Sequence, residues 1–153
     1  MSTIKAAITA VGAYVPDFVL TNKALESMVD TNEEWITSRT GIKERRILKE
    51  EGKGTSFLAI KAAQNLLAKA NVDPLEIDLL IMATATPDMP VASTGAYVAT
   101  EIGATNAFAY DLQAACSSFL FGMSTAAAYI ESGRYKKVLL IGADKMSSIV
   151  DYT

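Results

Sequence analysis

Two apolar runs, 77–83 (IDLLIMA) and 137–142 (KVLLIG), constrain the fold more than any other feature of this sequence. A short and almost continuous apolar run is typical of a strand that is covered on both faces, as in the centre of a parallel sheet. A third strand is predicted at 107–112, and helical patterns lie between the strands. This alternation predicts an α/β fold in which a mostly parallel, mixed sheet is flanked by helices.

Further elements follow from their end signals. The β-branched run 4–15 and the weakly alternating run 42–48 predict two more strands, the second at a sheet edge. Capping residues and terminal glycines or asparagines predict helices at 22–28, 33–39, 55–70, 93–102 and 116–132. The last of these helices is apolar around its whole circumference, which predicts burial on every side. No covering helix follows 137–142, so we expect this chain to be the first part of a longer fold.

The composition excludes several classes of function. The chain has 153 residues, half of them apolar, and a net charge of −3, which does not suit a nucleic-acid-binding surface. It has no apolar run of the roughly 18–20 residues that span a bilayer and no signal-peptide layout, so we expect a cytoplasmic protein without membrane contact. It has no histidine, which removes Cys-His and Ser-His pairs and most zinc sites, and we expect no bound metal.

The only cysteine, Cys116, lies in the stretch LQAACSSF, where a predicted strand ends and a predicted helix begins. The unpaired N–H groups and the positive end of the dipole at a helix N-terminus favour a thiolate, and small neighbours would let a substrate approach. A lone cysteine in an apolar stretch is otherwise an inert buried residue. From these residues alone, a nucleophile and an inert core thiol both stay open.

The only tryptophan, Trp35, lies on the otherwise polar helix 33–39, one helical turn before Arg39. A ring and a guanidinium on one helix face could hold a flat, charged nucleotide, although core packing is the commoner role of tryptophan. A basic cluster follows at 43–53, with glutamates between its members. It is either a solvated face or a local site for a phosphorylated or acidic ligand.

Five segments, taken in order, form a recognisable pattern: GAYVP at 12–16, DTNEEWITSRTGIKERR at 30–46, ATATPD at 83–88, DLQAACS at 111–117 and IGAD at 141–144. The second segment closely resembles the N-terminal signature of the β-ketoacyl-acyl-carrier-protein synthase III family, and the fourth resembles its nucleophile segment. The resemblance covers the whole chain and is to the N-terminal half of this family of condensing enzymes.

The resemblance implies a thiolase-like fold of two similar halves, with residues 1–153 as the N-terminal half. It implies an acyltransferase that starts fatty-acid biosynthesis by condensing an acyl-CoA primer, such as acetyl-CoA, with malonyl-acyl-carrier-protein through an acyl-cysteine thioester and decarboxylation. Cys116 would be the nucleophile, and Thr31, Trp35 and Arg39 would hold coenzyme A. The implied enzyme is a homodimer that takes a coenzyme A thioester as substrate and binds no permanent cofactor.

Parts of the family pattern are missing or altered. The family also uses a histidine and an asparagine of the C-terminal half, so we expect residues 1–153 alone not to catalyse condensation. Val91 stands where many relatives have phenylalanine, in a loop that reaches the partner subunit's acyl pocket, which suggests a wider pocket for longer or branched primers. Ser118 stands where relatives often have glycine. Two alternatives stay open: another thiolase-fold acyl-CoA condensing enzyme, or a non-catalytic dimerisation fragment in which Cys116 is structural.

Overall fold

The computed structural model describes residues 4–152, which divide into two compact units. The sheet unit contains the residues up to Tyr14 together with Gly54–Asp144. The ribbon unit contains Val15–Lys53 and the residues from Lys145 onward. Within the described part of the chain, no helix combines the length and the apolar character needed to cross a membrane.

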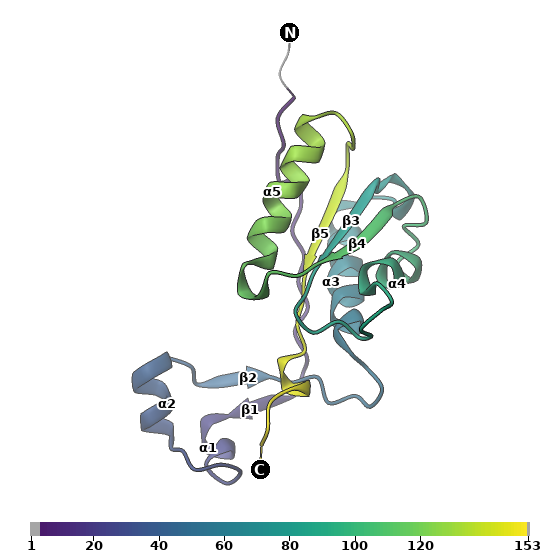
Figure 1. Cartoon of the computed structure of the whole chain (residues 1–153). Helices are drawn as coiled ribbons and strands as arrows, with labels where there is room; N and C mark the ends of the chain where they lie inside the picture. The colour runs from purple at the N-terminus through teal and green to yellow at the C-terminus, as the bar shows by residue number, and fades with distance from the viewer. Residues whose placement is uncertain (1–3, 153) are drawn as a thin grey trace. The chain divides into compact units, whose positions relative to one another are not determined.

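Parallel strands form the centre of the sheet unit: β3 (Leu79–Ala83), β4 (Phe108–Leu112) and β5 (Val138–Gly142). They lie in the order β4-β3-β5, and Leu79 at the start of β3 is opposite the first residue of each neighbour (Figure 1). Every residue of β3 is buried, which explains why its sequence shows no polar alternation. The predicted α/β class and the three predicted strands are confirmed, but only β3 is central, because β5 lies at an edge of the described sheet.

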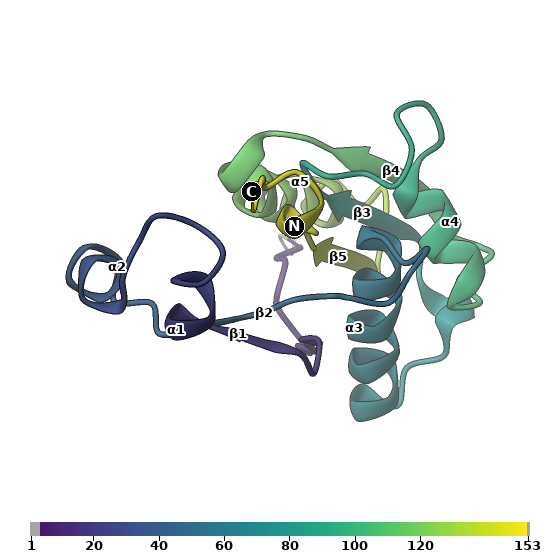
Figure 2. The same ribbon diagram turned by 90° about the horizontal axis from the view of Figure 1, so that it is seen from below.

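Helices cover both faces of this sheet: α3 (Thr55–Ala70), α4 (Thr94–Glu101) and α5 (Ser118–Glu131). Figure 2 shows α5 on one face of the sheet and α3 and α4 on the other. Successive side chains of a strand point to opposite faces of the sheet. Leu80 and Met82 of β3 point to one face and pack into the apolar cluster formed with α3 and α4. Leu140 of β5 points the other way and contacts α5 at Gly122.

Glycines at both contact points let α5 approach β5 closely. A Cβ atom added at Gly122 would stand 2.5 Å from Leu140 Cδ1, and one added at Gly142 would stand 2.8 Å from the Phe119 ring. The side of α5 that faces away from the sheet is open, and Leu120 there is 64% exposed. Among the described residues only one face of α5 meets the sheet, so the burial expected on every side of this helix stays a prediction that needs further protein to cover it.

Residues 4–15, all of them described, form no strand, so the strand predicted there is wrong. A strand needs backbone hydrogen bonds to a neighbouring strand, and this segment meets helix α3 instead. The N–H of Ala13 donates to Asn65 Oδ1 at 3.3 Å, and the Tyr14 ring packs edge-on against Phe57 with 6.0 Å between centroids. Individual side-chain contacts thus replace the pairing that the β-branched composition suggested.

The ribbon unit is built on an antiparallel strand pair that forms no ladder with the parallel sheet. The antiparallel pairing expected in a mixed sheet therefore occurs here as a separate ribbon. Helix α2 begins at the Asn32 cap and ends at Gly41, which has a φ of +70°, as its end signals predicted. The elements of this unit are β1 (Val19–Thr21), α1 (Asn22–Leu25), α2 (Glu33–Thr40), β2 (Glu44–Arg46) and the 3-10 turn η3 (Met146–Ser148).

A polar side chain lies at the centre of the ribbon unit. Asn22 is only 1% exposed, and its Nδ2 donates to the Ile42 carbonyl at 2.7 Å and to Thr37 Oγ1 at 3.2 Å. Its Oδ1 accepts from Arg45 Nη1 at 2.6 Å. Buried apolar side chains of the same unit are Leu20, Ile36 and Leu48. The interior of the ribbon unit is therefore held together largely by hydrogen bonds, whereas apolar contacts stabilise the interior of the sheet unit.

Candidate active site

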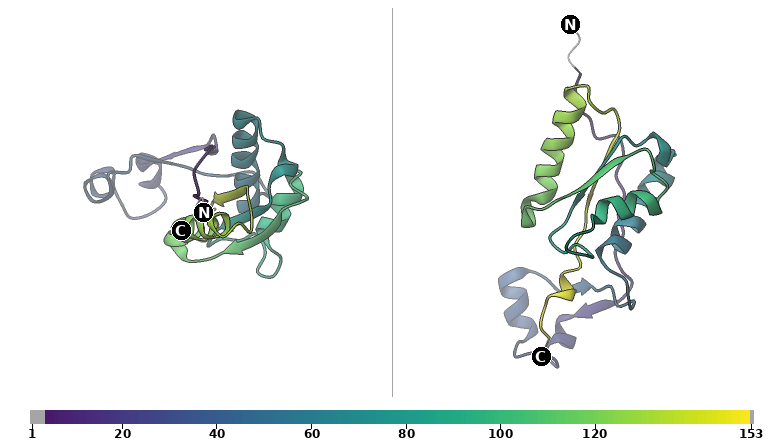
Figure 3. Two further views of the ribbon diagram at one scale, coloured as in Figure 1. Left: turned by 90° about the horizontal axis from the view of Figure 1, so that it is seen from above. Right: turned by 45° about the vertical axis from the view of Figure 1, so that its right-hand side comes forward.

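The chain turns between β4 and α5 (Figure 3). Cys116 lies in the 3-10 turn of this connection. Two residues after Leu112 the chain enters the 3-10 turn η2 (Ala115–Ser117), and α5 begins directly afterwards at Ser118. The predicted strand–helix junction is confirmed, although the α-helix starts two residues after Cys116 and not at it. Cys116 is exposed among the described residues, and its role as a nucleophile stays a prediction.

Ala115, directly before Cys116, has a φ of +47°. This is the left-handed region, which costs a residue with a Cβ atom about 1 kcal/mol or more. Such a conformation persists only where its surroundings hold it, and it occurs preferentially at functional sites. The backbone that presents the thiol is therefore strained.

A buried hydroxyl spans the strained residue. Ser118 is 3% exposed, and its Oγ accepts from the Ala114 N–H at 2.6 Å and donates to the Ala115 carbonyl at 2.8 Å. The N–H groups of Ser117 and Ser118 donate to the Ala114 and Ala115 carbonyls. The N–H of Cys116 has no acceptor among residues 4–152. An unpaired N–H beside a nucleophile is suited to stabilise the oxyanion of acyl transfer.

Two carboxylates hold the loops at the carboxyl edge of the sheet. Asp111 in β4 accepts from the Gly95 N–H at 2.6 Å and so fixes the start of α4. Asp144 after β5 accepts from the Ala85 N–H at 2.7 Å and holds the loop after β3, which carries the 98% exposed Val91. In the described part of the chain, no cluster of three acidic or cysteine side chains could hold a metal ion.

Sequence reasoning missed the roles of Asp111, Asp144 and Ser118. The available signal was chemical, because a carboxylate or hydroxyl set in an apolar strand or helix start must find hydrogen-bond partners there. The partners of the two carboxylates come from other loops, up to 60 residues away in the case of Thr84 and Asp144. Spacing along the chain cannot identify such partners.

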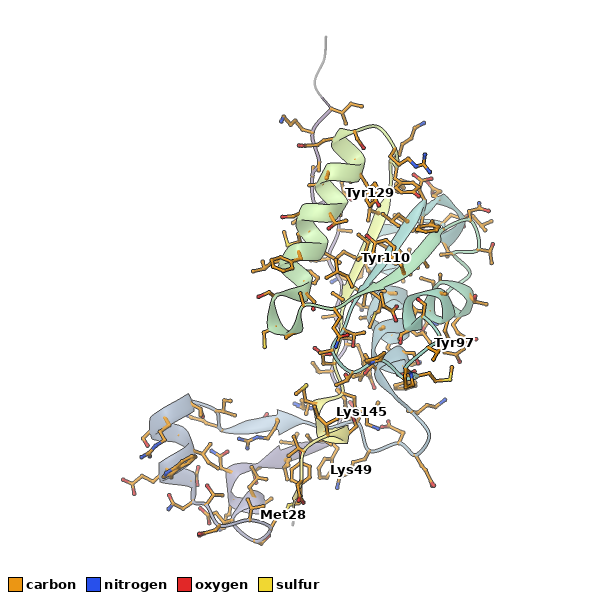
Figure 4. The ribbon with its side chains drawn as sticks, viewed as in Figure 1. Met28, Lys49, Tyr97, Tyr110, Tyr129 and Lys145 are labelled. Carbon is orange, nitrogen blue, oxygen red and sulfur yellow. The ribbon has the colours of Figure 1, made fainter. Side chains whose placement is uncertain are left out.

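A cluster of tyrosines lies between β4 and α5. Figure 4 shows Tyr110 of β4 near Tyr129 of α5, and the Tyr129 and Tyr135 rings pack edge to face with 5.3 Å between centroids. Burial raises the pKa of the Tyr110 phenol, and the nearby Tyr129 and Tyr135 add to this effect. Tyr110 therefore stays neutral at physiological pH and serves as a packing group.

The residues proposed for coenzyme A lie in the ribbon unit, whereas Cys116 belongs to the sheet unit. The guanidinium carbon of Arg39 lies 4.6 Å from the Trp35 ring centroid, and Trp35 is 51% exposed. Thr31 directly precedes the Asn32 cap of the same helix. The structure confirms that the ring and the positive charge share one helix face, and their binding role stays a prediction.

The basic cluster after α2 is largely engaged within its own unit. Arg45 takes part in the buried hydrogen-bond network described above, and Arg46 Nη1 donates to the Asp17 carbonyl at 3.3 Å. Lys49 Nζ lies 3.6 Å from the centroid of the Phe18 ring. These contacts favour a structural role on a solvated face over a separate site for a phosphorylated ligand.

Comparison with known proteins shows what the chain is related to. A family model described as 3-oxoacyl-[acyl-carrier-protein (ACP)] synthase III matches residues 110–153. All 153 residues align with β-ketoacyl-[acyl-carrier-protein] synthase III 2 of Bacteroides thetaiotaomicron at 56% identity. The crystal structure of 3-oxoacyl-[acyl-carrier-protein] synthase III from Aquifex aeolicus matches 97% of the chain with a TM-score of 0.91 and 46% identity. This chain is similar to the N-terminal half of β-ketoacyl-[acyl-carrier-protein] synthase III.

The chain spans about half the length of these synthase III relatives. It covers 46% of the Bacteroides protein and 47% of the Aquifex chain. The priming β-ketosynthase of the R1128 polyketide pathway also matches, with a TM-score of 0.88 and 37% identity over 94% of this chain and 42% of that one. The thiolase-like fold expected from the sequence is confirmed by the synthase III structures.

Proposed function

We propose that this chain is the N-terminal half of a β-ketoacyl-[acyl-carrier-protein] synthase III, an acyltransferase that starts fatty-acid biosynthesis. The observation that carries the proposal is the exposed Cys116 thiol in a strained strand–helix turn, within a chain 56% identical to a relative of that name. The proposed reaction condenses an acyl-CoA primer with malonyl-acyl-carrier-protein. Residues 1–153 would form one of two similar halves of the enzyme.

In the first step, the Cys116 thiolate attacks the carbonyl carbon of the acyl-CoA thioester. A new C–S bond forms to Cys116, the bond to the coenzyme A sulfur breaks, and the coenzyme A thiolate leaves and takes up a proton. Negative charge develops on the carbonyl oxygen during this attack. The unpaired N–H of Cys116 supports this step because it can donate to that oxygen.

In the second step, malonyl on the carrier protein loses carbon dioxide, and the resulting carbanion attacks the acyl-Cys116 thioester. A C–C bond forms, the C–S bond to Cys116 breaks, and the β-ketoacyl group stays on the carrier protein. Decarboxylation needs hydrogen-bond donors to the enolate oxygen, and this sequence contains no histidine to serve as one. We therefore propose that the other half supplies these donors and that residues 1–153 alone do not condense.

Trp35, Arg39 and Thr31 are proposed to hold coenzyme A. The half-exposed Trp35 ring offers a stacking surface for the adenine, and the guanidinium 4.6 Å from its centroid can pair with a phosphate. The enzyme would use the coenzyme A thioester as substrate and hold no permanent cofactor. A cytoplasmic site of action fits the exposed free thiol, since thiols persist in a reducing compartment.

In the proposed homodimer, the loop that carries Val91 reaches the acyl pocket of the partner subunit. The 98% exposure of Val91 supports this, because no described residue of its own chain covers the side chain. A phenylalanine there would narrow the pocket, so Val91→Phe should shift the preference from isobutyryl-CoA towards acetyl-CoA. Equal preference of the variant and the unchanged enzyme for these two primers would contradict the assignment.

Acyl labelling of the full-length protein tests the proposal directly. After incubation with radiolabelled acetyl-CoA, peptide mapping should place one acetyl group on the peptide that contains Cys116. Cys116→Ser should remove this label, because a hydroxyl without a nearby base is a far weaker nucleophile than a thiolate. An unlabelled Cys116 peptide in the unchanged protein would reject the enzyme and favour the non-catalytic dimerisation fragment.

A second candidate is a priming ketosynthase of a polyketide pathway, favoured by the 37% identity to the R1128 enzyme. It would use the same acyl transfer to Cys116, so labelling with acetyl-CoA does not separate the two. Condensation assays with the full-length protein would compare malonyl groups on fatty-acid and polyketide carrier proteins. Faster turnover with the fatty-acid carrier supports the first candidate.

A further inference from the structure

The turn around Cys116 contains a buried side chain that the two reaction steps leave without a role. The Ser118 hydroxyl bridges the Ala114 N–H and the Ala115 carbonyl, at 2.6 and 2.8 Å. These two backbone groups lie on either side of the Ala115 Cα atom, whose φ is +47°. The hydroxyl therefore closes a hydrogen-bonded ring around the strained residue.

Removal of the Ser118 hydroxyl is expected to let the turn change its backbone conformation. The Ala114 N–H would lose the acceptor that it has in the described structure, and an unsatisfied donor in a part-buried position is costly. Ala115 could then relax towards negative φ, which an alanine prefers. That rotation would move the peptide plane that leads into Cys116 and turn its thiol and N–H away from their present directions.

Ser118 itself is held in place by helix α5. The next residue, Phe119, packs on Gly142, and one turn later Gly122 packs on Leu140, so the helix start is fixed against β5. A hydroxyl on this first residue of the helix transmits that fixed position to the turn. The sheet thereby sets the conformation of the backbone before Cys116.

We propose that Ser118 is a positioning residue for Cys116. Its hydroxyl holds Ala115 in the left-handed conformation that directs the thiol and the Cys116 N–H together at an acyl thioester. Ser118 touches no substrate and acts through the backbone alone. The inference rests on the proposed function of Cys116 as the acyl-accepting nucleophile.

The test compares two reactions at Cys116 in the full-length protein, both followed by mass mapping of its peptide. Acylation by acetyl-CoA needs the thiol and the N–H in the right directions, whereas alkylation by iodoacetamide needs an accessible thiol. Ser118→Ala should slow acylation at least about tenfold and alkylation by less than about threefold. The matched control Ser124→Ala, an exposed serine on the same helix, should change neither rate.

A second pair of variants tests whether the Ser118 hydroxyl acts on Cys116 through the backbone conformation of Ala115. Glycine adopts positive φ without strain, so Ala115→Gly added to Ser118→Ala should restore acylation by at least about threefold. If Ser118→Ala alone does not fold, this double variant is compared with Ala115→Gly. A double variant no faster than Ser118→Ala would show that the hydroxyl does not act through Ala115.

The outcomes separate this inference from the proposed function. Equal acylation of the unchanged protein and Ser118→Ala, with only a lower melting temperature in the variant, would mean that Ser118 is merely structural. Alkylation at Cys116 without any acylation of the unchanged protein would reject the proposed function itself. A selective loss of acylation that Ala115→Gly repairs supports both.

Discussion

The sheet unit and the ribbon unit are stabilised by different interactions. In the sheet unit, β3 is buried along its whole length between two helical layers, and its residues are 0–3% exposed. In the ribbon unit, the most buried side chain among the described residues is Asn22, which lies in a network of hydrogen bonds. The proposed nucleophile, Cys116, therefore belongs to a unit with an apolar core. The proposed nucleotide-binding residues belong to a unit with a small polar core. Local opening is expected to be easier in the ribbon unit.

The largest effect is expected from a cavity in the sheet unit. Leu80 is 0% exposed, so Leu80→Ala should lower the free energy of unfolding by about 2–5 kcal/mol. Urea unfolding measures this loss. Leu75→Ala is the control, because Leu75 is 50% exposed and its loss should cost about 0.5 kcal/mol or less. Similar losses at both positions would contradict the apolar account of the sheet unit.

A smaller effect, confined to the other unit, is expected from Asn22→Ala. The change leaves the Arg45 guanidinium and the Ile42 carbonyl without their buried partner, which should cost about 2 kcal/mol. Hydrogen exchange should become faster within Val15–Lys53 and stay unchanged within Gly54–Asp144. Lys23→Ala, at the exposed neighbouring position, serves as control. Equal acceleration in both units would show that they open together and would break the comparison.

Trp35→Ala probes recognition in the ribbon unit apart from its stability. Because the ring is 51% exposed, its removal should leave the melting temperature unchanged. If the ring stacks on the nucleotide, KM for acetyl-CoA in the full-length enzyme should rise about tenfold, or about 1.4 kcal/mol, with little change in kcat. Trp35→Phe should keep part of the affinity. An unchanged KM in Trp35→Ala would remove this residue from the proposed site.

The smallest effect concerns a polar contact at the rim of the sheet unit. Hydrogen bonds from the N–H groups of Lys137 and Lys136 to Asp78 Oδ2, at 3.0 and 2.7 Å, lower the pKa of this carboxyl. Its folded pKa lies below the unfolded value of about 4, so the carboxylate stabilises the fold above pH 4 and this contribution disappears as pH falls through the folded pKa. Asp78→Asn should therefore cost about 1 kcal/mol at pH 7.

The same variant should show a smaller loss of stability between neutral and acidic pH than the unchanged protein, since it has no carboxylate to protonate. Thermal unfolding at a series of pH values measures both curves. If the stability of the variant and of the unchanged protein depended on pH in the same way, the charge of the Asp78 carboxylate would not contribute to stability.

The sequence predicted those features whose cause is local. The apolar runs of β3 and β5, the Asn32 cap and the Gly41 terminus of α2 all depend on neighbours in the chain, and all are confirmed. The strand predicted at 4–15 failed because strand formation depends on a partner strand, which composition does not reveal.

The details of the nucleophile turn were beyond sequence reasoning for the same physical reason. Nothing in the letters AAC marks Ala115 as left-handed, since glycine and asparagine are the residues that usually signal positive φ. The bridge from the Ser118 hydroxyl to the Ala114 N–H exists only once the strand and the helix have fixed both ends of the turn. The position of Cys116 between them was predictable, and the way it is held was not.

The packing of Tyr14 on Phe57 has a consequence for how such a chain could evolve. Tyr14 is the last residue before the segment 15–53, and the sheet unit resumes at Gly54, directly before helix α3 begins within one turn of Phe57. Both ends of the segment are thus fastened to the first turn of one helix, as with a module inserted into a host domain, and the residues from Lys145 onward complete the same unit. A short glycine-rich linker could replace it, or a foreign segment could take its place, while the strands and the thiol-bearing turn keep their positions. The unit that carries the proposed nucleophile and the unit that carries the proposed nucleotide site could in this way diversify independently.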